Sequence, residues 1–183
     1  MKTETEIKIE PMKTRVALHP FLVGMNRTQL ALLADCAMAT EFKEGQVIFR
    51  EGECANRFYL IESGKVALES AGNMGKPVII DTIGAGDLLG WSWMFPPHTW
   101  HFTARAIEPT KAIFFYGTIL RQYCERDHSL GYDLLKRMTS VMNRRMQAAR
   151  DKMLAIHNRT ETLKPIPHLS PFMETELDLP EAD

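Results

Sequence analysis

Between Phe42 and Phe115 the chain is divided into short runs of β-branched and aromatic residues by turns that contain glycine. Apolar residues recur in these runs with a period of about two, which is the pattern of strands that bury one face. The predicted strands are Phe42 and residues 46–49, 58–61, 65–69, 77–83 and 112–115. Because these strands are short and regularly spaced, they favour a β-barrel or jelly roll.

Helical spacing replaces the strand period on both sides of this region. Residues 18–39 predict a short helix, a turn and a second helix, with Asn26 or Thr28 as the N-cap before Gln29. Residues 121–157 predict a long amphipathic helix. Its apolar stripe consists of Leu134, Leu135, Met138, Val141, Met142, Met146, Ala149, Met153 and Ile156. The predicted fold class is mainly β with flanking helices: an N-terminal helix pair, a double-stranded β-helix (jelly-roll) β-roll and a long C-terminal helix.

Two blocks of the sequence resemble the cyclic nucleotide-binding domain family. The first block is Glu44-Gly45-x-Val47-Ile48-x-Arg50-Glu51-Gly52 followed by Phe58-Tyr59-Leu60-Ile61-x-x-Gly64-x-Val66, which is similar to the family's strand and turn signature. The second block is Gly86-Asp87-Leu88-Leu89-Gly90-Trp91-Ser92-Trp93-Met94-Phe95, which has the layout of the family's phosphate-binding cassette. The resemblance covers residues 18–157 and implies a sensor domain of the Crp/Fnr type.

The cassette of this chain lacks the two charged groups with which the family reads its ligand. Placing Gly90 on the cassette glycine puts Trp91 at the position of the family's ribose-reading glutamate and Trp100 at that of its phosphate-reading arginine. An indole supplies one hydrogen-bond donor, no acceptor and no charge. Because removing an ionic partner from a buried site costs about 2 to 5 kcal/mol, we expect an effector that is not a cyclic nucleotide.

Three interpretations of the altered cassette are open. In the first, Trp91 and Trp100 line a pocket for a flat or apolar effector, with Ser92 and His101 as its polar contacts. In the second, the two indoles pack on each other and fill the site, which leaves a ligand-free interaction adaptor. In the third, the alignment shifts by one residue, and a protonated His101 replaces the arginine for a weakly anionic ligand. The candidate ligand-binding residues are Leu89, Gly90, Trp91, Ser92, Trp100, His101 and Phe102.

Other residues near the cassette are expected to have structural roles. Arg105 is expected to tie strands together, and Trp93 to enter the barrel core. His98 and His101 are three residues apart, but Pro96-Pro97 places them in a loop, where we expect no metal site. We expect no cofactor and no enzyme activity, because motifs such as Gly-x-Ser-x-Gly and His-Glu-x-x-His do not occur in the sequence.

Composition narrows the classes of protein further. The formal net charge of −1 gives no global attraction to nucleic acid. No apolar run approaches the roughly 20 residues of a membrane span, and the first residues do not follow the order of a signal peptide. The cysteines at positions 36, 54 and 124 form no Cys-x-x-Cys pair, so we expect reduced thiols. These features predict a cytoplasmic protein without a membrane anchor.

The organisation predicted along the chain has three parts. Residues 1–17 are a mobile lead-in, residues 18–157 are the sensor domain with its long helix, and residues 158–183 are a disordered, acidic tail that contains proline. The resemblance implies a homodimer through the helix near residues 130–157, and the alternative is that this helix folds back on its own barrel.

The tail bears on the predicted function. Transcription regulators of this family carry a helix-turn-helix domain after the long helix, and the proline-containing tail leaves no room for two helices and a turn. We therefore predict a stand-alone regulatory protein that responds to a small molecule or a protein partner and signals to another protein. A transcriptional regulator is the less favoured alternative.

Overall fold

The computed structural model describes residues 12–72 and 75–162, with side chains up to residue 158. It begins with a helix over residues 12–18 and continues through a turn into α2 (Arg27–Asp35). Asn26 and Gln29 form a capping box, in which each side chain accepts a hydrogen bond from the backbone N–H of the other residue. The Asn26 N-cap and the second helix are confirmed, although α2 ends four residues before the predicted residue 39. The first helix lies at residues 12–18, before the predicted range of residues 18–39, and residues 19–24 form the turn.

The first helix shows that the predicted boundary at residue 17 lies too late in the chain. Val16 is fully buried. Arg15 Nε donates to Glu62 Oε1 at 2.7 Å, and His19 Nε2 lies 3.0 Å from the carbonyl oxygen of Ile61. These contacts offset the entropy lost when the segment is ordered. Residues 12–17 therefore belong to the folded domain, and residues 1–11 lie outside the described residues.

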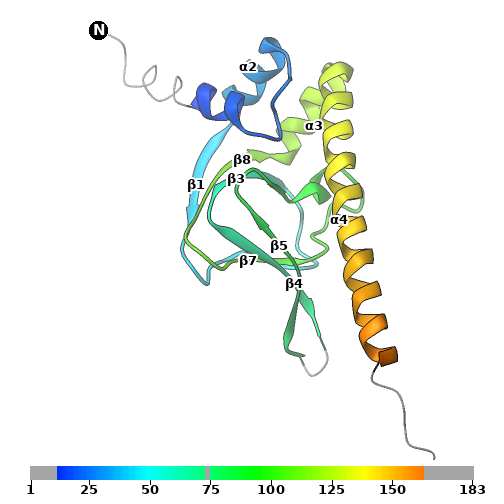
Figure 1. The fold of residues 1–183 in the computed structure, drawn as a ribbon. Helices are drawn as coiled ribbons and strands as arrows, with labels where there is room; N and C mark the ends of the chain where they lie inside the picture. The colour runs from blue at the N-terminus through cyan, green and yellow to red at the C-terminus, as the bar shows by residue number, and fades with distance from the viewer. Residues whose placement is uncertain (1–11, 73–74, 163–183) are drawn as a thin grey trace, which may run out of the picture. The chain divides into compact units, whose positions relative to one another are not determined.

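Antiparallel strands form two four-stranded sheets (Figure 1). The first sheet has the order β1 (Met38–Phe42), β8 (Thr110–Tyr116), β3 (Arg57–Ser63) and β6 (Leu88–Leu89). The second has the order β2 (Val47–Phe49), β7 (Thr103–Ala106), β4 (Lys65–Ala71) and β5 (Pro77–Gly84). This arrangement confirms the predicted class, mainly β with flanking helices and of the jelly-roll type.

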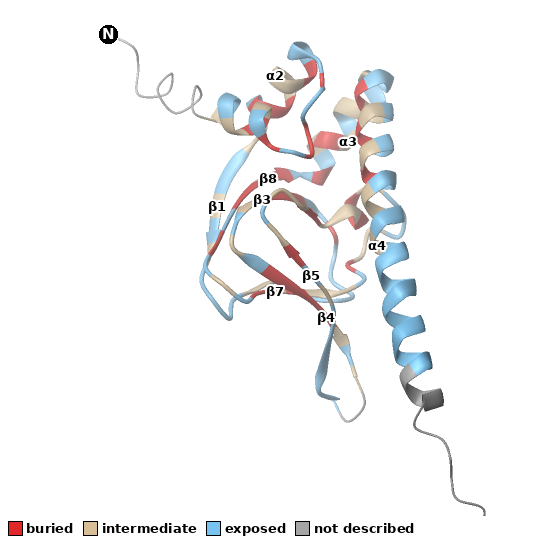
Figure 2. Cartoon of the chain, in the orientation of Figure 1, coloured by how far each residue is buried: buried red, intermediate tan, exposed pale blue. Residues whose placement is uncertain are grey.

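Side chains alternate across β3, so the first sheet packs against other elements on both faces. Tyr59 and Ile61 face the second sheet, whereas Phe58 contacts Phe21 from the N-terminal helical region with ring centroids 5.6 Å apart. The core between the sheets contains Phe49, Ala55, Tyr59, Ile61, Val66, Leu68, Ile83, Leu89, Trp100, Ala104 and Ala112. Figure 2 shows buried residues along the strands and on the helix faces that meet them.

The C-terminal helical region contains two helices where a single one is predicted. They are α3 (Gly117–Arg126) and α4 (His128–Thr162), separated by Asp127 in an extended conformation. The Asp127 carboxylate accepts from the Leu130 N–H at 3.1 Å, so it caps the start of α4. Helix α4 also continues beyond the boundary predicted at residue 157, since the first residue that cannot donate a helical hydrogen bond is Pro165. The rest of the predicted tail, residues 163–183, lies outside the described residues.

The described residues divide into two compact units, one that ends at residue 140 and one that begins at residue 141. In the first unit, Leu130, Leu134 and Met138 of α4 are buried, and Arg137 Nη1 donates to the backbone oxygens of Phe21 and Val23. The start of α4 is therefore fixed to the N-terminal helical region. Among the helices that the structure describes, none is long and apolar enough to cross a membrane.

Candidate ligand site at the cassette

The cassette glycine, Gly90, lies at a position that has no room for a side chain. Gly90 has φ +87°, in the left-handed region, and precedes the short 3-10 helix η2 (Trp91–Trp93). A Cβ atom at this position would lie 2.8 Å from Trp100 Cζ3 and 3.2 Å from the backbone oxygen of Arg57. The indole of Trp100 therefore packs directly against the backbone of the cassette glycine.

Trp100 lies in the core between the two sheets. Its side chain is only 4% exposed, and it stacks on Phe49 with ring centroids 3.8 Å apart and an interplanar angle of 12°. Its backbone is held by the β2–β3 turn, because Trp100 N donates to Glu53 O at 2.9 Å and Gly52 N donates to Trp100 O at 2.8 Å. Trp100, which the sequence alignment predicts at the position of the family's phosphate-reading arginine, is thus a fixed part of the hydrophobic core.

The other predicted site residues divide between the core and the surface. Leu89 is buried in the core, and Phe102 is partly buried against it. Ser92 is 2% exposed, and its hydroxyl oxygen lies 3.0 Å from Nδ1 of the exposed His101. Trp91 is half-buried. The structure thus joins Ser92 to His101 and Trp100 to Gly90, and it places Leu89, Trp100 and Phe102 in one cluster.

Arg105 has the structural role predicted for it. Its Nε donates to both carboxylate oxygens of Glu69, at 3.0 and 3.2 Å, and its Nη1 donates to Gly45 O at 3.1 Å. Glu69 is buried, so this ion pair supplies the charge partner that a buried carboxylate requires. Arg105 therefore ties β4 and β7 to the turn before β2.

Trp93 is buried as predicted, but in a different core. Its ring lies 5.9 Å from Phe58, on the helix-facing side of the first sheet, and a Cβ at Gly117 of α3 would lie 2.8 Å from Trp93 Cβ. Arg121 donates to the Trp93 carbonyl. The 3-10 turn after Gly90 rotates successive side chains apart, so Trp93 fills the space between sheet and helix and does not enter the barrel.

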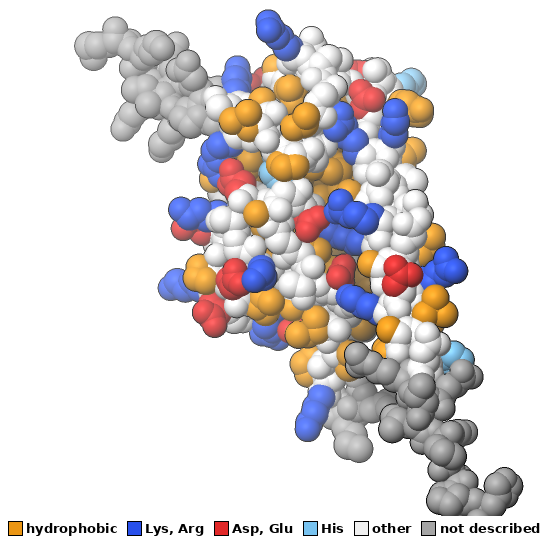
Figure 3. All heavy atoms as spheres, viewed as in Figure 1, with side chains coloured by type: hydrophobic (Ala, Val, Ile, Leu, Met, Phe, Trp, Pro, Cys, Tyr) orange, Lys and Arg blue, Asp and Glu red, His pale blue; other side chains and the backbone are white. Residues whose placement is uncertain are grey.

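The two loop histidines, His98 and His101, have different surroundings. Within residues 12–72 and 75–162, no group of three or more potential ligands among His, Cys, Asp and Glu could hold a metal ion. His98 has a positive φ of 56°, and His101 Nδ1 is engaged by Ser92. On the face shown in Figure 3, basic and acidic side chains are interspersed, which does not favour nucleic acid there.

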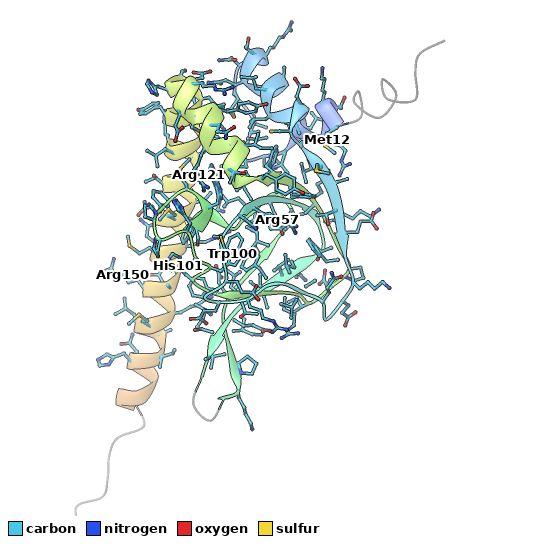
Figure 4. The ribbon with its side chains drawn as sticks, turned by 180° about the vertical axis from the view of Figure 1, so that it is seen from behind. Met12, Arg57, Trp100, His101, Arg121 and Arg150 are labelled. Atoms are coloured by element: carbon cyan, nitrogen blue, oxygen red, sulfur yellow. The ribbon has the colours of Figure 1, made fainter. Side chains whose placement is uncertain are left out.

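Sequence reasoning missed one charged residue beside the cassette. Arg57, the first residue of β3, is exposed and donates a hydrogen bond to the Tyr59 hydroxyl, which raises the pKa of the arginine. Burial raises the pKa of Tyr59, so this phenol stays neutral and can accept that bond. The strand period alone indicates that residues 57 and 59 share a face, but it does not indicate what an arginine there contacts. Figure 4 labels Arg57 together with Trp100 and His101.

The two sheets, the cassette and the flanking helices together are typical of a regulatory domain of the sensor class. Residues 39–127, just under half of the chain, match the family model of the cyclic nucleotide-binding domain. Among curated proteins it is similar to the CRP-like cAMP-activated global transcriptional regulator of Mycobacterium tuberculosis, with 25% identity over 130 residues. The match covers 71% of this chain and 56% of the relative, so the chain spans little more than half of that relative's length.

Solved structures show the same fold. A cyclic nucleotide-binding domain from Methylobacillus flagellatus has a TM-score of 0.68 at 18% identity, over 88% of both chains. The regulatory subunit of a cAMP-independent protein kinase A from Trypanosoma cruzi, bound to guanosine, has a TM-score of 0.61 at 23% identity. That match covers 75% of this chain and 48% of the subunit.

Proposed function

We propose that this protein is a non-catalytic regulatory module in which Trp100 occupies the interior where related domains bind a cyclic nucleotide. The proposal depends above all on the burial of Trp100 and its stack on Phe49. The ring packs against the cassette glycine, and the backbone of the same residue is fixed on both sides by the β2–β3 turn. The site is thus filled by the protein itself.

Charge supports the same conclusion. A cyclic phosphate in a buried site needs a cation or several N–H donors, and a ribose hydroxyl needs an acceptor. Arg105 is engaged by Glu69, and Trp91 and Trp100 carry no charge. Loss of the ionic partners costs about 2 to 5 kcal/mol, which corresponds to a loss of about two to three orders of magnitude in affinity.

The output of the module is a helix with a solvent-exposed apolar stripe. In the second unit, Met146, Met153 and Ile156 are 66%, 71% and 65% exposed. They recur at intervals of seven and three residues, as in the seam between two packed helices. We propose that a second copy of the chain covers this stripe, because an identical helix offers the same spacing of apolar side chains.

A second candidate is a sensor for another small molecule. The hydroxyl of Ser92 and the exposed ring of His101 provide polar groups beside the half-buried Trp91. The regulatory subunit of a cAMP-independent protein kinase A from Trypanosoma cruzi is bound to guanosine and is an example of this fold with another ligand. In this candidate function the effector contacts the cassette surface.

Calorimetric titration with cAMP and cGMP tests the proposal. We expect no binding to the natural chain, and binding at micromolar concentration or below to the double variant Trp91→Glu with Trp100→Arg, because it restores both charged groups. Phe95→Arg is the control, since it adds the same charge at an exposed position of the cassette region. Tight binding of either nucleotide by the natural chain would refute the proposal.

A further inference from the structure

Arg57 stands at the end of an inward-facing row of side chains on the first sheet. In the register of β3 and β8, Arg57 lies opposite Tyr116 and Tyr59 lies opposite Phe114. Directly opposed residues of antiparallel strands point to the same face of the sheet. Since Tyr59 belongs to the core between the sheets, Arg57 and Tyr116 continue this face to the point where it meets solvent.

The guanidinium is held by aromatic side chains. Its Cζ atom lies 5.4 Å from the centroid of Phe114 and 5.9 Å from that of Tyr116, which are cation–π distances. The rings of Phe114 and Tyr116 are themselves in edge contact, with centroids 5.5 Å apart. A hydrogen bond to the Tyr59 hydroxyl adds a third point of attachment. The orientation of the group is therefore fixed before any ligand arrives.

Arg57 has no acidic partner among the described residues, in contrast to four other cations of the domain. Arg15, Lys65, Arg105 and Lys111 are each within 4.0 Å of a carboxylate oxygen. No carboxylate of the described residues pairs with Arg57. A guanidinium has five N–H donors, and the described contacts use the Tyr59 hydroxyl as the hydrogen-bond acceptor. Donors remain for a planar anion that can accept two parallel hydrogen bonds.

We propose that Arg57 binds the carboxylate of a small organic ligand whose flat, apolar body rests on Tyr116 and Met38. Both side chains are partly exposed, Tyr116 at 36% and Met38 at 47%, and Met38 lies opposite Phe114 in the sheet register. A single guanidinium matches the charge and the two-oxygen geometry of a carboxylate. The backbone of Arg57 also lies beside Gly90, which the Trp100 ring contacts. The inference does not depend on whether the barrel admits a nucleotide.

Benzoate is the probe for this site, and benzamide is its uncharged counterpart. We would follow the Arg57 Nε–H signal and the Tyr116 ring signals by NMR during titration. We expect saturable shifts of both with benzoate, and binding of benzamide or of inorganic phosphate at least about tenfold weaker, because the first lacks the charge and the second lacks the apolar body. Arg57→Gln should weaken benzoate binding by about tenfold or more, whereas Lys111→Gln, which removes a paired cation from β8, should leave it unchanged.

Several results would overturn the inference. Equal benzoate affinity in Arg57→Gln would show that another group binds the anion, and equal affinity for phosphate would show that the rings do not select the ligand. If Arg57→Gln fails to fold, Tyr116→Leu gives the second test. It keeps the guanidinium and removes one ring, so unchanged benzoate affinity in that variant would also contradict the proposed contact.

Discussion

Replacing Trp100 by alanine tests directly whether the indole is part of the core. The side chain is almost fully buried and lies against Gly90, which has no side chain that could close the space left behind. Truncation of a buried tryptophan costs about 3 to 5 kcal/mol, and loss of the stack on Phe49 adds about 0.5 to 1.5 kcal/mol. We therefore expect Trp100→Ala to lower the free energy of unfolding by about 5 kcal/mol, much of the stability of a typical domain.

The measurement is urea unfolding followed by far-UV circular dichroism. The midpoint should fall while the slope of free energy against urea concentration stays the same, since the fold is kept and only its stability changes. Trp91→Ala is the matched control, because it removes the same ring from a half-buried position and should cost about half as much. A loss below about 1 kcal/mol for Trp100→Ala would refute the packing argument.

Two further predictions concern the helix and the N-terminal region. The double variant Met146→Glu with Met153→Glu should be a monomer when its molecular mass is measured by light scattering, whereas the natural chain should be a dimer. Ala148→Glu, on another face of α4, should leave the dimer intact. An unchanged mass for the double variant would contradict the proposed helix-to-helix seam. Burial lowers the pKa of His19 from its ordinary value of 6.5, so the neutral form is favoured in the folded state. The contribution of His19 to stability is complete above pH 6.5 and is lost as the pH falls from there through the lowered pKa of the folded state. His19→Gln should therefore reduce the dependence of the melting temperature on pH over that range. An unchanged pH dependence in this variant would contradict the role of His19.

The main elements of the fold were predictable because local rules and tertiary packing agree in them. Period-two runs between glycine turns predict most of the strands, and the Asn26 capping box is a short-range signal. Strand β6 has two residues, which is too short for any period to show. The break at Asp127 was missed because apolar spacing continues across it, although an aspartate is a good N-cap.

The candidate site could be predicted only in part. Alignment on Gly90 predicts that Trp91 and Trp100 replace the family's charged residues, but it does not decide whether an indole lines a cavity or fills it. That choice depends on the stack with Phe49, a residue distant in sequence. The contacts of Arg57 could not be predicted from the sequence either, because they depend on the register between β3 and β8.

The attachment of Trp100 to the chain has a consequence for any molecule that would enter the barrel. A covalently attached occupant is present at an effective local concentration in the millimolar range or above, and it cannot be diluted or washed out. A metabolite would have to displace the ring as well as make its own contacts. If the displaced form lies about 3 kcal/mol higher, the apparent affinity of that metabolite falls by a factor of about 150. Under the proposed function, the indole would act as an intramolecular competitor of that metabolite, and the strength of this competition would depend on one side chain.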